Sequence, residues 1–204
     1  MNLIKHWNTV YETKEQETLG WYEKDTSKTW ELINESGVAT DARIIHIGAG
    51  TTTLVDEMLA ESFTNMMATD LSKSALDKLA NRVGANNIEC IVDDLSHPSS
   101  LNKIVPVDFW IDRAVLHFLT EESERRAYFD LLKNKVKVGG YVILAQFAID
   151  GAEKCSGLPV YRYNIEMMSA YLGSDFEIIK SFDHIYINPG GAERPYVYAL
   201  FKRV

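Results

Sequence analysis

The sequence has few cysteines and prolines and no long hydrophobic run. Its two cysteines, Cys90 and Cys155, form no CxxC pair or Cys/His cluster, which argues against a disulfide framework and a zinc site. No stretch reaches the roughly 18 apolar residues of a membrane span, and the first residues lack the apolar core of a signal peptide. We therefore expect a cytoplasmic protein without a membrane partner or a metal.

Positive charge is also scarce. Lysine and arginine number 21 against 29 acidic residues, giving a formal net charge of -8 and a pI of about 5.1. A nucleic-acid partner needs clustered cations that neutralise phosphates. The densest basic cluster, Lys133, Lys135 and Lys137, falls where a helix is expected to end, and there cations complement the helix dipole. The sequence thus favours a small-molecule partner over a nucleic acid, with a monomer or a homodimer both open.

What the 204 residues do contain is an alternation of short apolar runs with amphipathic segments. This alternation is typical of an α/β fold with a doubly wound, mainly parallel sheet and helices on both faces. The length and the 46% of hydrophobic residues suit one core, so we predict a single domain over residues 1–204. Seven strands are expected, at residues 43–47, 65–69, 88–92, 107–111, 141–147, 176–187 and 196–202.

Helical patterns lie between most of these strands. The pattern over residues 72–83 gathers its apolar residues on one face and ends at Gly84, a common helix stop. Another helix is expected over residues 121–136, with Thr120 as its N-cap. The pair Gly139-Gly140 then predicts a turn into the fifth strand. The last two strands have no helix between them, so they should pair antiparallel at the sheet edge.

A glycine turn after the first strand is the strongest chemical signal. The apolar residues 44–47 run directly into Gly-Ala-Gly at 48–50, and a helical pattern follows over 54–60. Such a turn lets the backbone pass close to a ligand and presents amide groups to it. Asp70, at the end of the second strand, is placed to bind the hydroxyls of a ribose. Thr53 stands where a nicotinamide or flavin site would have a third glycine, so those cofactors are disfavoured.

Successive strand ends carry further short motifs. They are Ile44 to Leu54, Ala68-Thr69-Asp70-Leu71-Ser72, Val92-Asp93-Asp94-Leu95, Trp110-Ile111-Asp112-Arg113-Ala114 and the Lys137-Val138-Gly139-Gly140 turn. Together these motifs resemble those of class I, Rossmann-like S-adenosylmethionine-dependent methyltransferases, in particular a small, single-domain bacterial branch, and the resemblance covers about residues 40–204. It implies the strand order 3-2-1-4-5-7-6, with an antiparallel C-terminal pair, and S-adenosylmethionine as the cofactor.

The resemblance also assigns roles to residues. In that family the glycine turn lies under the methionine part of the cofactor, and the next strand ends meet the ribose and the adenine. Cofactor-binding roles are thereby implied for Gly48, Ala49, Gly50, Asp70, Leu71, Asp94, Leu95 and Asp112, the last near the methyl group. Many members carry an acid two residues before the first glycine, where it fixes the amino group of the cofactor. This chain has His46 there, which leaves that contact open.

Residues 1–40 precede the first strand and are rich in large aromatic side chains. These are Trp7, Tyr11, Trp21, Tyr22 and Trp30. Apolar surface of this size seldom stays exposed to water, and it can be buried against the open end of a parallel sheet. We expect a partly helical lid over a core at 41–204, with Trp21 against the cofactor sulfonium through a cation-π contact and Tyr22 facing the acceptor. Packing onto the outer helices is the other interpretation, and we prefer it for Trp30, on a helix expected over 26–36.

Candidate residues for the acceptor side follow the fourth and fifth strands. His117 is either a general base, since histidine titrates near neutral pH, or a histidine hydrogen-bonded at a helix start. Cys155 lies in a loop expected to border the acceptor pocket, whereas Cys90, inside the third strand, should hardly react with thiol reagents. Arg113 and Arg162 are candidates for binding the acceptor, and Arg162 would suit an anionic group.

These features predict an enzyme that moves a methyl group from S-adenosylmethionine to an O, N or S atom of a small molecule and releases S-adenosylhomocysteine. The opening residues 6–11 and 21–22 resemble a subgroup that holds both bacterial small-molecule enzymes and seven-strand protein lysine methyltransferases. A protein lysine methyltransferase therefore stays open, as does a cofactor-binding module without catalysis. An acidic rim with a lysine-sized channel would favour the lysine enzyme, and a closed lid would disfavour it.

Overall fold

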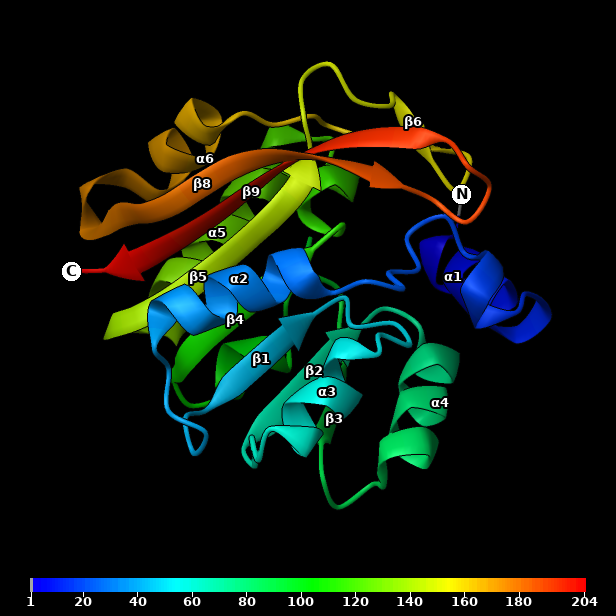
Figure 1. The fold of residues 1–204 in the computed structure, drawn as a ribbon, viewed down its shortest axis with the longest axis horizontal. Coiled ribbons are helices and arrows are strands. Elements are labelled where there is room, and N and C mark those ends of the chain that lie inside the picture. The colour runs from blue at the N-terminus through cyan, green and yellow to red at the C-terminus, as the bar shows by residue number, and fades with distance from the viewer. Residues whose placement is uncertain (1) are drawn as a thin grey trace.

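The computed structural model describes residues 2–204, and its centre is a seven-stranded sheet (Figure 1). The strands lie in the order β3-β2-β1-β4-β5-β9-β8; the first five are parallel, and β9 is antiparallel to both β5 and β8. Since β8 and β9 are the sixth and seventh long strands, the predicted order is confirmed. The strands are β1 (Ile44–Ile47), β2 (Met66–Asp70), β3 (Glu89–Val92), β4 (Val107–Arg113), β5 (Val136–Phe147), β8 (Phe176–Ile187) and β9 (Glu193–Arg203).

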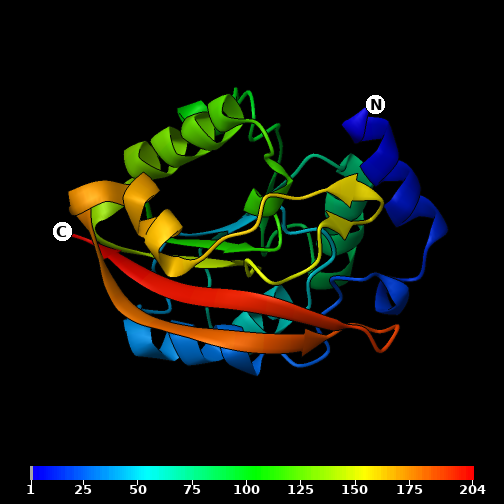
Figure 2. The ribbon, with the colours of Figure 1, turned by 90° about the horizontal axis from the view of Figure 1, so that it is seen from above.

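Helices cover both faces of this sheet, as the alternating pattern predicted. Successive strand residues face opposite sides, so Ile44 packs with α2, α3 and α4, whereas Ile45 packs with α5 and α6. Figure 2 shows α5 and α6 on one side of the sheet and α2 on the other. None of the helices within residues 2–204 is long and apolar enough to cross a membrane. They are α1 (Leu3–Thr13), α2 (Ser27–Ser36), α3 (Leu54–Ala60), α4 (Lys73–Val83), α5 (Glu122–Lys135) and α6 (Ile165–Leu172), with 3-10 turns η1 (Gln16–Thr18), η2 (Leu101–Lys103), η3 (Leu116–Phe118) and η4 (Gly173–Asp175).

Local hydrogen bonds set the starts of the two longest core helices. The hydroxyl oxygen of Ser72 accepts the amide of Ala75 at 3.2 Å, which begins α4. At α5 the N-cap is Glu121, because its side chain and that of Glu124 form a reciprocal capping box; the Glu124 carboxylate accepts the Glu121 amide at 3.1 Å. The prediction that Thr120 is the N-cap was therefore wrong.

The fifth strand is longer than predicted. It begins at Val136, directly after α5, so Gly139 and Gly140 lie inside β5. The pairing passes from Val107 with Val136 to Phe109 with Tyr141, and Gly139 has a φ of 82°, so the chain forms a bulge over residues 137–140 where a turn was expected. A side chain at position 140 would bring its Cβ within 2.9 Å of the carbonyl oxygen of Asp108. Glycine is needed there because the backbones of β4 and β5 approach closely at this bulge.

Three further differences lie at the margins of the sheet. β9 begins at Glu193, which pairs with Ile187, so the loop between the last two strands is shorter than the sequence suggested. A small hairpin of β6 (Lys154–Cys155) and β7 (Leu158–Pro159) follows β5. Cys90 is exposed, because β3 is the edge strand next to β2 and most of its residues are exposed. Its expected protection was wrong.

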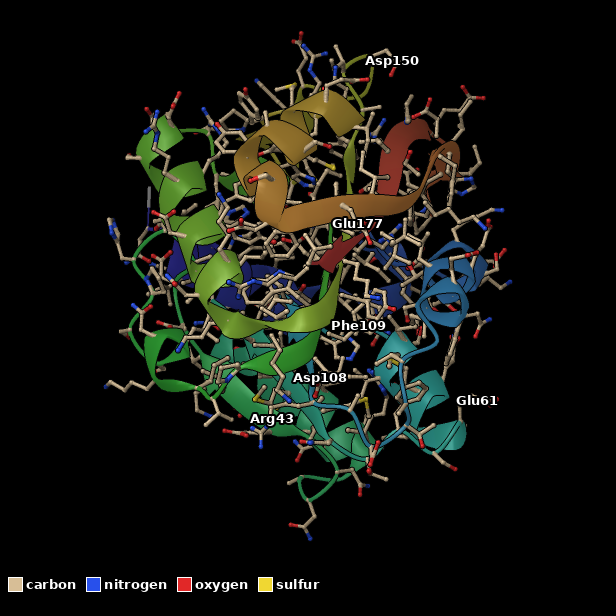
Figure 3. All side chains as sticks on the ribbon, turned by 90° about the vertical axis from the view of Figure 1, so that its left-hand side faces the viewer. Arg43, Glu61, Asp108, Phe109, Asp150 and Glu177 are labelled. Carbon is tan, nitrogen blue, oxygen red and sulfur yellow. The ribbon has the colours of Figure 1, made fainter. Side chains whose placement is uncertain are left out.

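A polar cluster closes the amino ends of β1 and β4. The amide of Arg43 donates to Oδ2 of Asp108 at 2.9 Å, and the amide of Asp108 donates to the Arg43 carbonyl at 2.8 Å (Figure 3). Lys137 forms an ion pair with the same carboxylate at 2.8 Å. These bonds pair the polar groups at the amino ends of the strands. The glycine turn follows the carboxyl end of β1 and therefore lies at the opposite edge of the sheet.

Candidate functional site

The carboxyl ends of β1, β2 and β4 border a cleft with two cavities. Cavity A lies over the end of β2 and the segment after β3, and the space between its walls, mouth included, is about 860 Å³. Cavity B lies over β1 and the start of α3, with about 630 Å³. Trp21, Gly48 and Arg113 line both cavities, so we call these three residues the junction. Open α/β sheets bind their ligands at this edge.

The N-terminal segment forms the roof of the cleft. Trp7 and Tyr11, one helical turn apart on α1, line cavity A, and residues 21–23 line cavity B. The rings of Trp7 and Trp21 meet edge to face with centroids 5.4 Å apart. The Ser72 hydroxyl donates to Oδ1 of Asn8 at 2.8 Å, which fastens α1 to the start of α4. Figure 1 shows α1 beside the strand ends and α4.

The glycine turn forms the floor at the junction. Gly48 and Gly50 have φ angles of 52° and 54°, in the left-handed region that favours glycine. A Cβ at Gly48 would collide with the side chain of Val115, and one at Gly50 would collide with the hydroxyl of Tyr11. Ala49 lies between them and lines cavity B. Both glycines are therefore required by conformation, Gly48 also by the close approach of the segment after β4 and Gly50 by that of the roof.

Asp70 links this turn to the end of β2. Its Oδ2 accepts the amide of Gly50 at 2.9 Å, and its Oδ1 accepts the amide of Ser72 at 2.7 Å. Burial raises the pKa of Asp70 to about 6, while the backbone amides act in the opposite direction. The carboxyl group lines cavity A, and its two oxygens have lone pairs left for further donors.

The residues predicted to meet the adenine also line cavity A. Leu71, Asp94 and Leu95 are all part of its wall, and Phe118 from η3 lines the same cavity. Asp93, which the sequence did not single out, supports this wall: its Oδ2 accepts the amide of Leu101 at 2.8 Å. The cavity thus brings the ends of β2 and β3 together with η3.

Cavity B contains buried polar atoms that the sequence did not assign. His46 Nε2, Thr29 Oγ1 and Arg113 Nη2 are each buried without a hydrogen-bond partner among residues 2–204, and all three residues line this cavity. Burial lowers the pKa of His46 to about 4, so its ring is neutral at pH 7. An unsatisfied buried polar atom is costly, so these three atoms are candidates for hydrogen bonds to a polar ligand. The sequence showed His46 at the position where many members of the resembling family carry an acid, but nothing in the sequence marked Thr29 as a site residue.

Arg113 is held by three elements of the fold. Its Nε forms an ion pair with Glu23 at 2.9 Å and a hydrogen bond with the Tyr198 hydroxyl at 3.0 Å, and its Nη1 donates to the Trp21 carbonyl at 3.0 Å. The guanidinium also lies 4.9 Å from the ring centroid of Tyr186. Burial raises the pKa of Glu23 despite the opposing effect of Arg113. These contacts fix Arg113 at the junction and fasten the roof to the sheet.

Asp112 lies on the other face of the sheet. It precedes Arg113 in β4, so its side chain points toward α5, where it accepts bonds from the Tyr128 hydroxyl at 2.6 Å and Gln146 Nε2 at 2.8 Å. It also accepts the amide of Val115 at 3.2 Å. Burial raises its pKa to about 6. Asp112 lines neither cavity, and these bonds shape the chain after β4.

His117 is enclosed within η3. Its ring stacks on Phe147 with centroids 4.6 Å apart, and neither ring nitrogen has a partner in the described part of the chain. Burial, together with the charge of Arg113, lowers the pKa of His117 to about 3. The ring therefore does not titrate near neutral pH as the sequence suggested, and it lines neither cavity.

The other acceptor-side candidates are divided by the fold. Tyr22 lines cavity B. Cys155, on β6, is half-buried against the core and outside both cavities, and burial raises the pKa of its thiol to about 11. Arg162 also lies outside them; its Nη1 donates to the Gly151 carbonyl at 3.2 Å, and its Nη2 lies 3.8 Å from Glu153.

The sequence is similar to that of one curated enzyme. It is 25% identical over 158 residues to EEF1A lysine methyltransferase 2 of Mus musculus, a match that covers 69% of this chain and 63% of that protein. The match therefore spans less than two thirds of the relative. No family model matches the sequence.

The structure is similar to several solved methyltransferases. A S-adenosylmethionine-dependent methyltransferase from Anabaena variabilis ATCC 29413 superposes with a TM-score of 0.79 at 18% identity, over 99% of this chain and 93% of the other. The N-methyltransferase NodS of Bradyrhizobium japonicum WM9 in complex with S-adenosylhomocysteine gives 0.73 at 13%, over 100% and 99%.

A third match is 1,6-didemethyltoxoflavin-N1-methyltransferase of Burkholderia thailandensis, with bound 1,6-didemethyltoxoflavin and S-adenosylhomocysteine. It gives a TM-score of 0.67 at 15% identity, over 99% of this chain and 87% of the other. The structural neighbours are thus S-adenosylmethionine-dependent methyltransferases with a Rossmann-like fold, and this chain shares that fold.

Proposed function

We propose that this chain is a S-adenosylmethionine-dependent methyltransferase that acts on a small molecule and releases S-adenosylhomocysteine. The observation that carries the proposal is the hydrogen bond between Gly50 and Asp70, which joins the glycine turn to an acid at the wall of cavity A. The fold is shared with methyltransferases that bind this cofactor. The arrangement supports a ligand with a ribose at Asp70 and a chain that extends over the turn.

The walls of the two cavities fit the parts of this cofactor. In cavity A, Asp70 offers a carboxylate to the ribose hydroxyls, Leu71 and Leu95 offer apolar surface to the adenine, and Asp94 suits its amino group. In cavity B, Nε2 of the neutral His46 has no partner in the part of the chain that the structure describes, and in the tautomer protonated at Nδ1 it offers a lone pair to the ammonium of the methionine part. Such a ligand would give this buried atom the partner it lacks.

The protein's own part in the reaction is positioning and exclusion of water. The bound cofactor supplies a methyl group on a positively charged sulfur, and an in-line displacement needs the acceptor held opposite that sulfur. The fixed glycine turn would hold the cofactor chain, and Trp21 at the junction offers an aromatic face to the positive charge. The roof of α1 and residues 21–23 would form the lid over both cavities, where electrostatic effects are strengthened.

The roof also supports a small acceptor over a protein side chain. A lysine substrate must enter from a partner's surface, whereas here Trp7, Tyr11 and Trp21 cover the strand ends. The match to a lysine methyltransferase is the one observation that favours that second function. The two are separated by supplying labelled S-adenosylmethionine with either a mixture of small metabolites or a protein extract from which small molecules have been removed.

Calorimetry with S-adenosylhomocysteine tests the proposal directly. We expect micromolar or tighter binding and a higher melting temperature, as for any ligand that binds the native state, and no comparable effect of NADH. Stabilisation by NADH and not by S-adenosylhomocysteine would refute the proposed cofactor. Cofactor binding without methyl transfer to either class of acceptor would favour the non-catalytic module.

A further inference from the structure

Arg113 is the charged residue of the junction. Of the three residues that line both cavities, Trp21 and Gly48 carry no charge. If the cofactor extends from cavity A into cavity B, as the proposed function requires, its sulfur passes the junction. Arg113 is therefore the charged residue that would border both the adenosine part and the amino-acid part of the cofactor.

One nitrogen of Arg113 is left without a partner. Nε bonds Glu23 and Tyr198, and Nη1 bonds the Trp21 carbonyl. Nη2 is buried and has no partner within residues 2–204. The two N–H groups of Nη2 are thus held in place by contacts made elsewhere on the same guanidinium. Because an arginine donor cannot be neutralised by losing a proton, an oxygen from a ligand is the natural partner.

The groups around the junction are poorly suited to take a proton from an acceptor at neutral pH. The pKa of His46 is about 4 and that of His117 about 3, so both rings are weak bases. Glu23 is engaged with Arg113 and Tyr198, and Asp70 with two backbone amides. An acceptor that is already an anion at pH 7 needs no base. A carboxylic acid meets this condition, whereas an ordinary thiol or ammonium does not.

We propose that the methyl acceptor is a carboxylate, held at the junction by Nη2 of Arg113, and that the product is a methyl ester; this inference rests on the proposed function. One carboxylate oxygen accepts the Nη2 donor, and the other attacks the methyl carbon. A new O–C bond forms as the S–C bond breaks, and the electron pair of that bond stays on sulfur to give neutral S-adenosylhomocysteine. No proton moves. The Glu23 charge balances that of Arg113, so binding of the acceptor depends chiefly on the free N–H groups of Nη2.

The test begins with the protein saturated with S-adenosylhomocysteine. Acetate and acetamide have nearly the same shape and differ in charge, so their affinities are compared by NMR titration. We expect acetate to bind at least tenfold more tightly. The double variant Glu23→Gln with Arg113→Gln removes both charges of the buried pair together and should abolish the preference. Arg162→Gln, at an arginine outside both cavities, is the matched control and should retain it. Circular dichroism and thermal unfolding verify that each variant is folded.

A second measurement separates the acceptor from the cofactor's own carboxylate. 5′-Methylthioadenosine shares the adenosine and the sulfur of S-adenosylhomocysteine but lacks its amino-acid part. We expect the double variant to leave the ratio of the two affinities within about twofold of wild type. If the variant weakens S-adenosylhomocysteine tenfold or more and spares methylthioadenosine, Arg113 binds the cofactor and the inference is overturned.

The remaining outcomes also support or overturn the inference. Equal binding of acetate and acetamide by the wild-type complex, or an unchanged preference in the double variant, overturns the inference while the proposed function stands. Failure of the wild-type protein to bind S-adenosylhomocysteine refutes the proposed function, and the inference with it. Methyl transfer that mild alkali reverses, as it does for esters, would support the inference once a carboxylic acid substrate is found.

Discussion

The amide of Gly50 donates a hydrogen bond of 2.9 Å to Oδ2 of Asp70, which ties the loop after β1 to the end of β2. The two residues lie 20 positions apart, and their strands are neighbours, with Ile47 opposite Thr69. A glycine amide and an acid thus share one wall of the cleft. The bond holds the turn in its left-handed conformation before any ligand arrives, so the turn need not be ordered on binding.

Replacing Asp70 with asparagine should weaken S-adenosylhomocysteine binding about 10- to 100-fold. Asparagine keeps the shape but loses the charge that strengthens bonds to the ribose hydroxyls, worth about 1.5–3 kcal/mol, and its amide nitrogen cannot accept one of the two backbone amides that Asp70 accepts. Titration calorimetry measures the change. Asp108→Asn, at the opposite end of the sheet, is the control and should leave the affinity unaltered. Equal affinities of Asp70→Asn and wild type would remove Asp70 from the site.

Cofactor affinity should fall at acid pH. The pKa of Asp70 is about 6 in the free protein because the group is buried, and the ionised form is the one that accepts the ribose hydroxyls. Above pH 7 the affinity should be constant, and below pH 6 it should decrease by up to about tenfold per pH unit. The same titration on Asp70→Asn should be nearly flat. A parallel decrease in that variant would assign the pH dependence to another group.

Asp112 should make the fold less stable as pH rises. Its pKa is raised from 3.8 to about 6 by burial, so the folded state binds the proton more tightly than the unfolded chain. The stabilising effect is complete below about pH 4 and is lost as pH rises through 6, which corresponds to about 3 kcal/mol. Urea unfolding is measured for wild type and Asp112→Asn at pH 4 and 7. The free energy of unfolding of wild type, relative to that of the variant, should be lower at pH 7 than at pH 4 by up to that amount. A difference independent of pH would contradict the shift.

Removal of the roof should separate binding from folding. A chain without residues 1–24 keeps every strand of the sheet but loses Trp7, Tyr11 and Trp21 from the cleft. We expect a folded core by circular dichroism and at least tenfold weaker binding of S-adenosylhomocysteine. Trp21→Ala in the full chain should act in the same direction. Trp30→Phe is the matched control, because Trp30 packs against Phe63 outside both cavities. Full affinity in the truncated chain would show that the segment only packs.

The two cysteines should react at different rates. Cys90 is exposed on β3, whereas Cys155 is half-buried and burial raises its pKa to about 11, which leaves little thiolate at pH 8. Iodoacetamide should therefore label Cys90 several times faster than Cys155, as measured by mass spectrometry of the two peptides. Faster labelling of Cys155 would indicate that the β6–β7 hairpin opens in solution.

The strands and the glycine turn could be predicted because they depend on local signals, whereas the order of the strands was implied by the resemblance to a family. Apolar runs at regular intervals mark strands, and residues 48–50 combine glycines with a strand on one side and a helix on the other. The bulge at Gly139 and Gly140 was predicted as a turn for a related reason. A glycine required by a neighbouring backbone gives the same sequence signal as one required by a turn, and only the approach of Asp108 distinguishes them.

By itself, the sequence determined which strand ends carry polar residues, since a strand and its boundaries are encoded within a few neighbouring positions. The tertiary structure decided which of those residues meet. Asp112 and Arg113 are adjacent in sequence, yet the alternation of side chains in β4 sends one to Tyr128 on α5 and the other to the junction. Thr29 and Glu23 reach cavity B from segments that carry no motif. Their contribution depends on how the N-terminal segment packs over the sheet, which is set by contacts between residues far apart in the chain.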